Sequence, residues 1–174
     1  MLFTDWTLLR LFPPLRAAWA RVGTPASVCI TGENAKAVLF GAIHLRTAHR
    51  VVVARPRAGG ADARAFLHEL RRCYRGRRTI WLLADRASAH TDRQTQALAA
   101  ELDIQFVWLP KQAPALNAMD QLWRPLKAVI AANRQAPDVA TLVSAAMLWV
   151  LMLSPSEARR LAGMQSPHFW LRDL

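Results

Sequence analysis

The sequence predicts an α/β fold, in which helices cover a sheet that contains parallel strands. The first observation is a strand–helix–strand succession, with apolar runs at 79–84 and 104–109 on either side of a helix at 91–102. A connection of this length joins parallel strands, whereas antiparallel neighbours need only a tight turn. The second observation is a pair of strands at 37–44 and 50–54, separated by a turn-like segment. Together the two observations predict a mixed sheet.

A further strand is expected at the start of the chain, where residues 1–5 end in an acid, Asp5. This strand can lie beside the strand that ends in Asp85. Because it begins almost at the first residue, we expect upstream sequence to be missing. An irregular connection follows at 10–26, where proline and glycine interrupt the pattern. Trp19 in this connection is expected to be a packing anchor.

Helical periodicity predicts a helix at 61–74, where Phe66, Leu67, Leu70 and Tyr74 recur at helical spacing. Two more helices are predicted at 138–153 and 156–162, and Ser-Pro-Ser-Glu at 154–157 is a start signal for the second. The longest apolar run, Val139 to Leu153, is shorter than the roughly 20 residues that span a bilayer. It is therefore interpreted as a buried helix.

The helix predicted at 117–133 carries two different stripes. The apolar stripe contains Met119, Leu122, Trp123, Leu126, Val129 and Ile130, and the polar stripe contains Asn117, Asp120, Arg124 and Lys127. Asp120 therefore lies in the first turn, at the rim of the buried face, where the helix dipole favours an acid. The dipole alone would account for an aspartate at this position, so the stripe does not decide its role.

The net charge points to a polyanionic partner. The 174 residues contain 23 Lys and Arg against 12 Asp and Glu, a formal charge of +11, and nearly all the cations are Arg. The planar guanidinium suits phosphate contacts, which favours nucleic acid over an inert basic surface. The two cysteines, Cys29 and Cys73, are placed on core or helix positions and form no zinc motif, so a reducing compartment is adequate.

Three aspartates stand at the ends of core elements, namely Asp5, Asp85 and Asp120. Carboxylates on separate elements suit a hard divalent cation such as Mg²⁺, which takes oxygen ligands and keeps waters and substrate phosphates. Two such ions would support an in-line phosphoryl displacement. Ser88 with His90 lacks the surroundings of a nucleophile, and no glycine-rich phosphate loop is present. On residues alone, metal chemistry is one option among several.

Three motifs resemble the catalytic core of IS630/Tc1/mariner transposases: LADRASAH at 83–90, VWLP at 107–110 and PALNAMDQLWRPLK at 114–127. That group has a strand ending in Asp-Asn-x-x-x-His, a strand ending in Leu-Pro, and Ser-Pro-x-Leu-Asn-Pro-Ile-Glu-x-x-Trp-x-x-Leu-Lys. Thirty-four residues separate Asp85 from Asp120, a spacing typical of the group. Weaker matches at 2–5, 14–23, 40–42 and 154–171 extend the resemblance over essentially the whole chain.

The resemblance implies an RNase H-like fold over residues 1–174: a mixed five-stranded sheet flanked by helices, with C-terminal helices. It implies cleavage and strand transfer of DNA with two Mg²⁺ or Mn²⁺ ions, and it makes Asp5, Asp85 and Asp120 the catalytic and metal-binding triad. Supporting roles fall to His90 and Asn117, and DNA contacts to Arg86, Lys111, Arg124 and Lys127, whereas Trp123 is expected to pack the helix.

The implied partners are DNA, as transposon ends and target, a separate N-terminal DNA-binding half, and a second copy in a homodimer. The helix-turn-helix region that reads transposon ends is not found in this sequence. No membrane partner is implied, and the expected location is the bacterial cytoplasm, at the nucleoid.

Two alternatives remain open. The first is a degenerate, catalytically inactive DNA-binding remnant, because Trp6 follows the first acid where the group has Glu, and Arg86 replaces an Asn. Arg86 would then pair with Asp85, although it is also placed to reach a phosphate. The last acid is Asp120, where Glu is usual in the IS630 branch. The second alternative is a general RNase H-like nuclease acting on another nucleic acid, which the Leu-Asn-x-x-Asp-x-x-Trp motif argues against.

Overall fold

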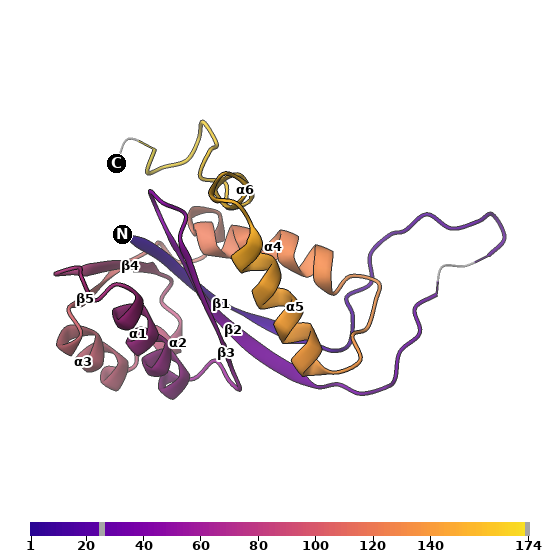
Figure 1. Ribbon diagram of the computed structural model, residues 1–174, viewed down its shortest axis with the longest axis horizontal. Coiled ribbons are helices and arrows are strands. Elements are labelled where there is room, and N and C mark those ends of the chain that lie inside the picture. The colour runs from indigo at the N-terminus through magenta and orange to yellow at the C-terminus, as the bar shows by residue number, and fades with distance from the viewer. Residues whose placement is uncertain (25–26, 173–174) are drawn as a thin grey trace.

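The computed structural model describes residues 1–24 and 27–172, so Pro25 of the predicted connection lies outside the described part. One sheet forms the middle layer, and helices cover both of its faces (Figure 1). The strands are β1 (Leu2–Arg10), β2 (Lys36–His44), β3 (Arg50–Arg55), β4 (Ile80–Ala84) and β5 (Ile104–Trp108). Their order across the sheet is β3-β2-β1-β4-β5.

The sheet is mixed, as the sequence predicts. Strands β1, β2 and β3 pair antiparallel, whereas β4 pairs parallel with both β1 and β5. Whether neighbouring strands pair antiparallel or parallel agrees with the length of the connections between them. A short turn joins β2 to β3, and helical crossovers lead into β4 and β5.

The helices divide between the two faces (Figure 1). They are α1 (Gly60–Cys73), α2 (Ser88–Thr91), α3 (Arg93–Glu101), α4 (Ala118–Ile130), α5 (Val139–Met152) and α6 (Pro155–Leu161), with a 3-10 turn at Pro114–Leu116. Helices α1 and α3 bury apolar side chains against one face, and α4, α5 and α6 bury theirs against the other. Asp92 caps α3 through its bond with the Thr95 amide, and Ser154 and Glu157 form the capping box of α6.

Strand β1 is longer than predicted, which moves Asp5 from a strand end to the middle of a strand. All nine residues of β1 pair with β2, from Leu2 opposite His44 to Arg10 opposite Lys36. A carboxylate is unusual inside a central strand, because Asp is rarely found in a protein interior. The ladder with β2 supplies hydrogen bonds to the backbone beyond it, and Asp5 lies opposite Gly41.

Gly41 gives α4 its close approach to the sheet. A Cβ built on Gly41 would stand 2.6 Å from Met119 Cε and 2.6 Å from Trp123 Cζ2. Trp123 is 2% exposed, so the expectation that it packs the helix is confirmed. The indole and thioether therefore occupy the space that any side chain at position 41 would need.

Several expectations about burial are wrong. Trp19 is fully exposed and anchors nothing, and Cys29 is exposed in a segment without helix or strand. Cys73 is on α1 as expected, although it too is exposed. The apolar run at 104–109 is typical of a buried strand, but β5 forms an edge of the sheet, and Ile104 is its one fully buried residue. An apolar run reads the same in a central strand and at an edge, so the sequence alone could not separate them.

Helix α5 also differs from the buried helix that its composition predicts. Its buried residues are Leu142, Ala146 and Val150, which form one stripe, while Leu148 is 62% exposed and Met152 is 75% exposed. A helix that covers the outside of a sheet can bury only one side, and the outward side of α5 is apolar as well. Within the described part of the chain no single helix is long and apolar enough to cross a bilayer; only the sharply bent α5–α6 pair reaches that length and composition together.

The connection between β1 and β2 projects from the body as an arm, formed by residues 11–24 and 27–35 (Figure 1). Its base is tied to the segment after α4. Asn133 accepts a bond from the Arg16 amide at 2.7 Å and donates one to the Arg16 carbonyl at 3.0 Å. Gln135 accepts from the Thr31 amide at 2.6 Å on the returning half. The base of the arm thus has a defined position beside the end of α4.

Gly41→Ala should lower the free energy of unfolding by about 1–3 kcal/mol, because the added methyl group overlaps Trp123 and Met119. Gly76→Ala is the matched control, since a Cβ there meets no atom within 4 Å. Urea unfolding of both variants at one pH measures the difference. Equal midpoints for the two variants would contradict the close packing of α4 on β2.

Candidate active site

The three predicted aspartates line a single cavity of about 490 Å³. Asp5 comes from the middle of β1, Asp85 follows the last residue of β4, and Asp120 lies in the first turn of α4. The wall is completed by residues after β4, by the loop that follows β5 and by the start of α4: Arg86, Ala87, Leu109, Pro110, Lys111, Gln112, Ala113, Pro114 and Asn117.

Strand register explains why Asp5 and Asp85 meet. Strands β1 and β4 run parallel with Phe3 opposite Leu83. The same offset, continued by two residues, sets Asp5 level with Asp85. This is the carboxyl end of β4, where sites gather in open α/β sheets.

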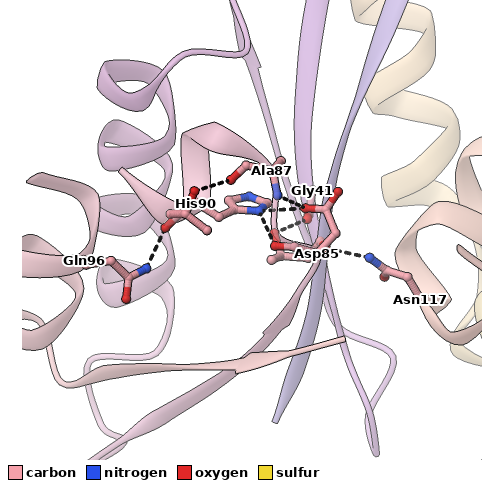
Figure 2. Close-up of polar contacts among 8 residues, drawn as sticks. Gly41, Asp85, Ala87, His90, Gln96 and Asn117 are labelled. Atoms are coloured by element: carbon pink, nitrogen blue, oxygen red, sulfur yellow. Dashed lines mark hydrogen bonds and ion pairs between the residues drawn. The ribbon is translucent and has the colours of Figure 1, made fainter. Parts of the chain in front are cut away.

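Asn117 fixes the start of α4 relative to β1. It is 4% exposed and is the N-cap of the helix, with its Oδ1 accepting the Met119 amide at 3.0 Å. Its Nδ2 donates to the carbonyl of Thr4 at 2.9 Å, one residue before Asp5 (Figure 2). A single amide side chain therefore caps the helix that carries Asp120 and ties it to the strand that carries Asp5.

Asp85 is held by His90 on α2. The Nδ1 atom of His90 lies 3.0 Å from Asp85 Oδ1, and the Ala87 amide donates to the same oxygen at 3.2 Å (Figure 2). His90 is 3% exposed, and its carbonyl accepts a bond from Gln96 at 2.6 Å. The hydrogen bond from His90 holds the pKa of Asp85 below its usual value, against a smaller opposing effect of burial. Asp85 is therefore ionised at neutral pH.

The pKa of Asp5 is shifted in the opposite direction. Burial raises its pKa to about 7, and the negative charges of Asp120 and Asp85 add to the rise, while the backbone amide of Trp6 opposes it. Burial disfavours a charged carboxylate because the protein solvates it less well than water does. With a pKa of about 7, Asp5 is partly protonated at neutral pH. A cation bound in the cavity would favour its charged form.

Asp120 forms an ion pair with Arg124 one helical turn later, at 3.2 Å. The pair lies at the surface and contributes little to stability. Arg124, one of the predicted DNA contacts, is thus engaged with the third aspartate in this structure. Arg86 and Lys111 line the cavity. Lys127 lines a different cavity, at the far end of α4.

Arg86 does not pair with Asp85 among residues 1–24 and 27–172, where the partner of Asp85 is His90. Trp6 points away from the cavity, since it packs on the α1 side of the sheet. The three carboxylates share the cavity without converging: no group of three or more Asp, Glu, His or Cys in the described part is arranged to hold a metal ion.

Comparison with known proteins places these features in a family. A family model described as DDE superfamily endonuclease matches residues 1–143. The chain belongs to the DDE superfamily endonucleases. It is 27% identical over 154 residues to the insertion element IS630 uncharacterized 39 kDa protein of Shigella sonnei, covering 88% of this chain and 45% of that protein. The chain thus spans about half the length of the curated relative that it matches.

Solved structures give the same fold. The Mos1 transposase in a paired-end complex with its left transposon end matches with a TM-score of 0.71 at 16% identity, over 92% of this chain and 50% of that chain. The catalytic domain of Mos1 mariner transposase matches with a TM-score of 0.65 at 14% identity, over 92% and 74% of the two chains. The predicted RNase H-like fold and the IS630/Tc1/mariner relationship are confirmed.

In this member of the DDE superfamily, the fold brings together all three predicted acids, both residues predicted to support them and two of the four predicted DNA contacts. The loop after β5, which carries the predicted contact Lys111, also forms the cavity wall, and Gln112 adopts φ +57° within it. Sequence reasoning missed the short α2 that carries His90 and the role of Asn117 as a cap. The Asp-x-x-x-x-His spacing and the Asn before Ala-Met-Asp were the available signals.

The stability of the metal-free protein should depend on pH through Asp5. Its folded pKa, about 7, is above its ordinary value of about 3.8, so the folded state keeps a proton that the unfolded chain has lost. The contribution of Asp5 to stability is therefore fully present below pH 4 and is lost as pH rises to 7, at up to about 1.4 kcal/mol per pH unit.

Asp5→Asn lacks this proton and should lack this part of the slope. Urea unfolding in EDTA at pH 5, 6 and 7.5 measures the difference in unfolding free energy between wild type and the variant. As pH rises, the unfolding free energy of wild type should fall relative to that of Asp5→Asn. A difference that stays constant over these pH values would show that Asp5 is not held in a charge-disfavouring environment.

Proposed function

We propose that this chain is the catalytic domain of a transposase, which cleaves DNA and transfers the strand by divalent-metal-dependent phosphoryl transfer. The observation that carries the proposal is the single cavity lined by Asp5, Asp85 and Asp120, in a chain that belongs to the DDE superfamily endonucleases. We extend it to the whole chain, residues 1–174, as one catalytic unit.

The donor set suits Mg²⁺ or Mn²⁺. Mos1 structures that match this chain include paired-end complexes with Mg and with Mn. Mg²⁺ takes one or two carboxylates and fills its remaining positions with waters and substrate phosphates, so a preformed three-residue cage is not required. Asp85 is already ionised, and a cation in the cavity would favour the charged form of Asp5. We propose two ions, which activate the attacking oxygen and stabilise the leaving oxygen when bound.

The chain's own groups then have separate tasks. His90 and the Ala87 amide orient Asp85, and Asn117 keeps the start of α4 at a fixed height over β1. Arg86 and Lys111 stand on the cavity wall without a carboxylate partner among the described residues, which suits contacts with the phosphates flanking the scissile bond. If Asp120 binds a metal ion, its ion pair with Arg124 is released, and Arg124 becomes available to contact DNA.

The proposed partners are DNA, both as transposon ends and as target, a separate DNA-binding half and a second copy of the chain. The formal charge of +11 supports a polyanionic partner. The length of the IS630 relative, of which this chain covers 45%, supports a separate DNA-binding half. The match to Mos1 bound to a transposon end supports the choice of DNA.

An inactive DNA-binding remnant is the second candidate. The observation that favours it is the ion pair between Asp120 and Arg124, together with the lack of convergence of the three carboxylates in the described chain. The substitutions that first suggested it count for less: Arg86 does not pair with Asp85, and Trp6 is directed away from the cavity. A remnant would bind DNA with an affinity that falls with salt, at a log–log slope of about −0.9 per phosphate contacted, and would not cleave.

Asp85→Asn should abolish nicking of DNA that carries the transposon ends, which are sought as terminal inverted repeats in the genomic sequence around the gene. The assay uses supercoiled plasmid with Mg²⁺ or Mn²⁺ and the chain joined to its DNA-binding half, and we expect a loss of at least about 100-fold because the ionised ligand is removed. Asp103→Asn is the matched control, since Asp103 adopts φ +52°, which Asn tolerates, and does not line the cavity. Nicking that is equal in wild type and Asp85→Asn, or absent from both, contradicts the proposal.

Metal binding has a separate readout that needs no activity. Saturating Mg²⁺ or Mn²⁺ should raise the melting temperature of wild type at pH 7.5, because the cation binds only the folded state. Asp85→Asn should lose most of this shift, and Asp103→Asn should keep it. An identical shift in all three proteins would place the cation outside the aspartate cavity.

A further inference from the structure

Strand β3 leaves one edge of the sheet open. It is the first strand in the order β3-β2-β1-β4-β5, so within the described part of the chain β2 is its one neighbouring strand. The His44 amide donates to the His49 carbonyl at 2.9 Å, which marks these two residues as a hydrogen-bonded pair. Such pairs alternate along an antiparallel ladder, so the odd-numbered residues of β3 direct their backbone groups to β2. The even-numbered residues direct theirs to the open edge: Arg50, Val52 and Ala54.

A groove of about 390 Å³ runs along this open edge. Its floor is a continuous stretch of chain, residues 49–53, and its walls come from the helices that cover the two faces of the sheet (Figure 1). One wall belongs to α1 and contains Glu69, Arg72 and Cys73, and the other belongs to α5 and contains Met147 and Leu151. A groove that follows an edge strand between two helices has the form of a slot for one more extended strand.

The α5 wall of the groove carries no charge. None of the 14 residues of α5 is acidic or basic, although Leu151 is 47% exposed. Helical spacing brings Ala140 and Ser144, which are exposed as well, to the same side of the helix as Met147 and Leu151. A surface helix ordinarily turns a polar side to water. Small and apolar side chains beside an open sheet edge therefore mark a contact surface.

Arg50 holds α5 in place beside β3. Its Nε donates to the Val150 carbonyl at 3.1 Å, and its Nη2 donates to the Leu151 carbonyl at 3.0 Å. The guanidinium thus neutralises the carbonyl end of α5. It does not stand in the groove as an unpaired cation, so the charge of Arg50 does not oppose an apolar contact along α5.

The α1 wall presents an acid and a base together. Glu69 and Arg72 pair at 2.8 Å, and the Arg72 side chain is 74% exposed. Such a surface pair contributes little to the stability of one chain. About a two-fold axis, however, the same patch meets itself, and Arg72 of one copy can pair with Glu69 of the other. The α1 wall is therefore complementary to itself, whereas a wall of one sign would repel a second copy.

We infer that β3 pairs antiparallel with β3 of a second copy, about a two-fold axis at Val52, so that two sheets join into one. This register sets Arg50 opposite Ala54 of the second copy, and it matches the outward backbone groups of both strands. The same axis brings the uncharged wall of α5 against its equivalent. The inference rests on the second copy that the proposed function names as a partner, and it gives that partner a surface.

The strand register links this dimer to the aspartate cavities. Asp5 lies opposite Gly41, and Gly41 lies opposite Val52, so the three residues form one row that ends at the axis. Five strand spacings of about 4.8 Å then separate the two Asp5 residues, roughly 24 Å. An axis perpendicular to the sheet keeps both aspartate cavities on the same face. The groove and the aspartate cavity share no residue, so the dimer leaves both cavities accessible.

Sedimentation velocity over a concentration series, in EDTA and without DNA, tests the inference on the whole chain. Wild type should show a monomer–dimer equilibrium. Leu151→Lys should weaken the dimer at least about tenfold, because pairing would bury an unpaired charge. Met152→Lys is the matched control, since Met152 is 75% exposed in the same turn and does not line the groove. A monomer at every concentration, or equal dissociation constants for the two variants, would overturn the inference.

Disulfide crosslinking tests the register. In a background with Cys29→Ser and Cys73→Ser, Val52→Cys should form a covalent dimer under mild oxidation. Directly paired residues on the axis stand about 5.5 Å apart between Cα atoms, which is within disulfide reach. Val53→Cys is the control, because residue 53 faces the α1 side of the sheet and lies opposite residue 51 of the second copy. No crosslink at position 52, or equal crosslinking at positions 52 and 53, would contradict the pairing.

A strand from another protein, such as the separate DNA-binding half, is the alternative occupant of the groove. This chain would then stay monomeric and uncrosslinked, and the inference would fail. None of these measurements uses DNA or a metal ion. Failure of the β3 dimer and failure of the proposed DNA cleavage are therefore separate outcomes.

Discussion

The contact between α4 and the bare backbone of β2 at Gly41 is the constraint on which the site depends. Trp123 and Met119 rest where a side chain would otherwise project, so α4 lies low over the centre of the sheet. Gly41 is opposite Asp5 in the ladder, and Asn117 ties the first turn of α4 to the carbonyl before Asp5. The position of Asp120 relative to Asp5 is therefore set by the packing of α4 on Gly41 and by the side-chain amide of Asn117.

The cavity gathers charges that oppose one another. Asp85 is stabilised as an anion by His90, whereas Asp5 is buried beside two other acids and holds its proton to about neutrality. Packing keeps the three carboxylates in one cavity despite this repulsion, and Arg86 and Lys111 line the same cavity. Such an arrangement is unfavourable for a protein alone and favourable for one that binds cations together with a phosphate chain.

Much of the candidate site could be predicted because its signals are local. Asp85 follows a strand and Asp120 lies in the first turn of a helix that the apolar pattern defines, and both belong to short motifs with fixed spacing. The predictions that were wrong share a physical cause: the surroundings of a residue depend on which distant segments pack or pair with its element. Trp19 is exposed because the arm leaves the body, α5 is half exposed because it covers only one side of the sheet, and Asp5 lies in mid-strand because β2 extends the ladder to Arg10.

From sequence alone one can predict the α/β class, most of the helix and strand order, the basic charge and three candidate acids. These follow from periodicity and from motif spacing, which act over a few residues. The strand register that sets Asp5 level with Asp85, and the partners of Asp85 and Asp120, become visible only in the folded chain. The same is true of the cavity at the far end of α4, whose walls come from positions near 10, 34 and 130. Residues so far apart in the chain meet only through packing and long-range pairing, which no local pattern records.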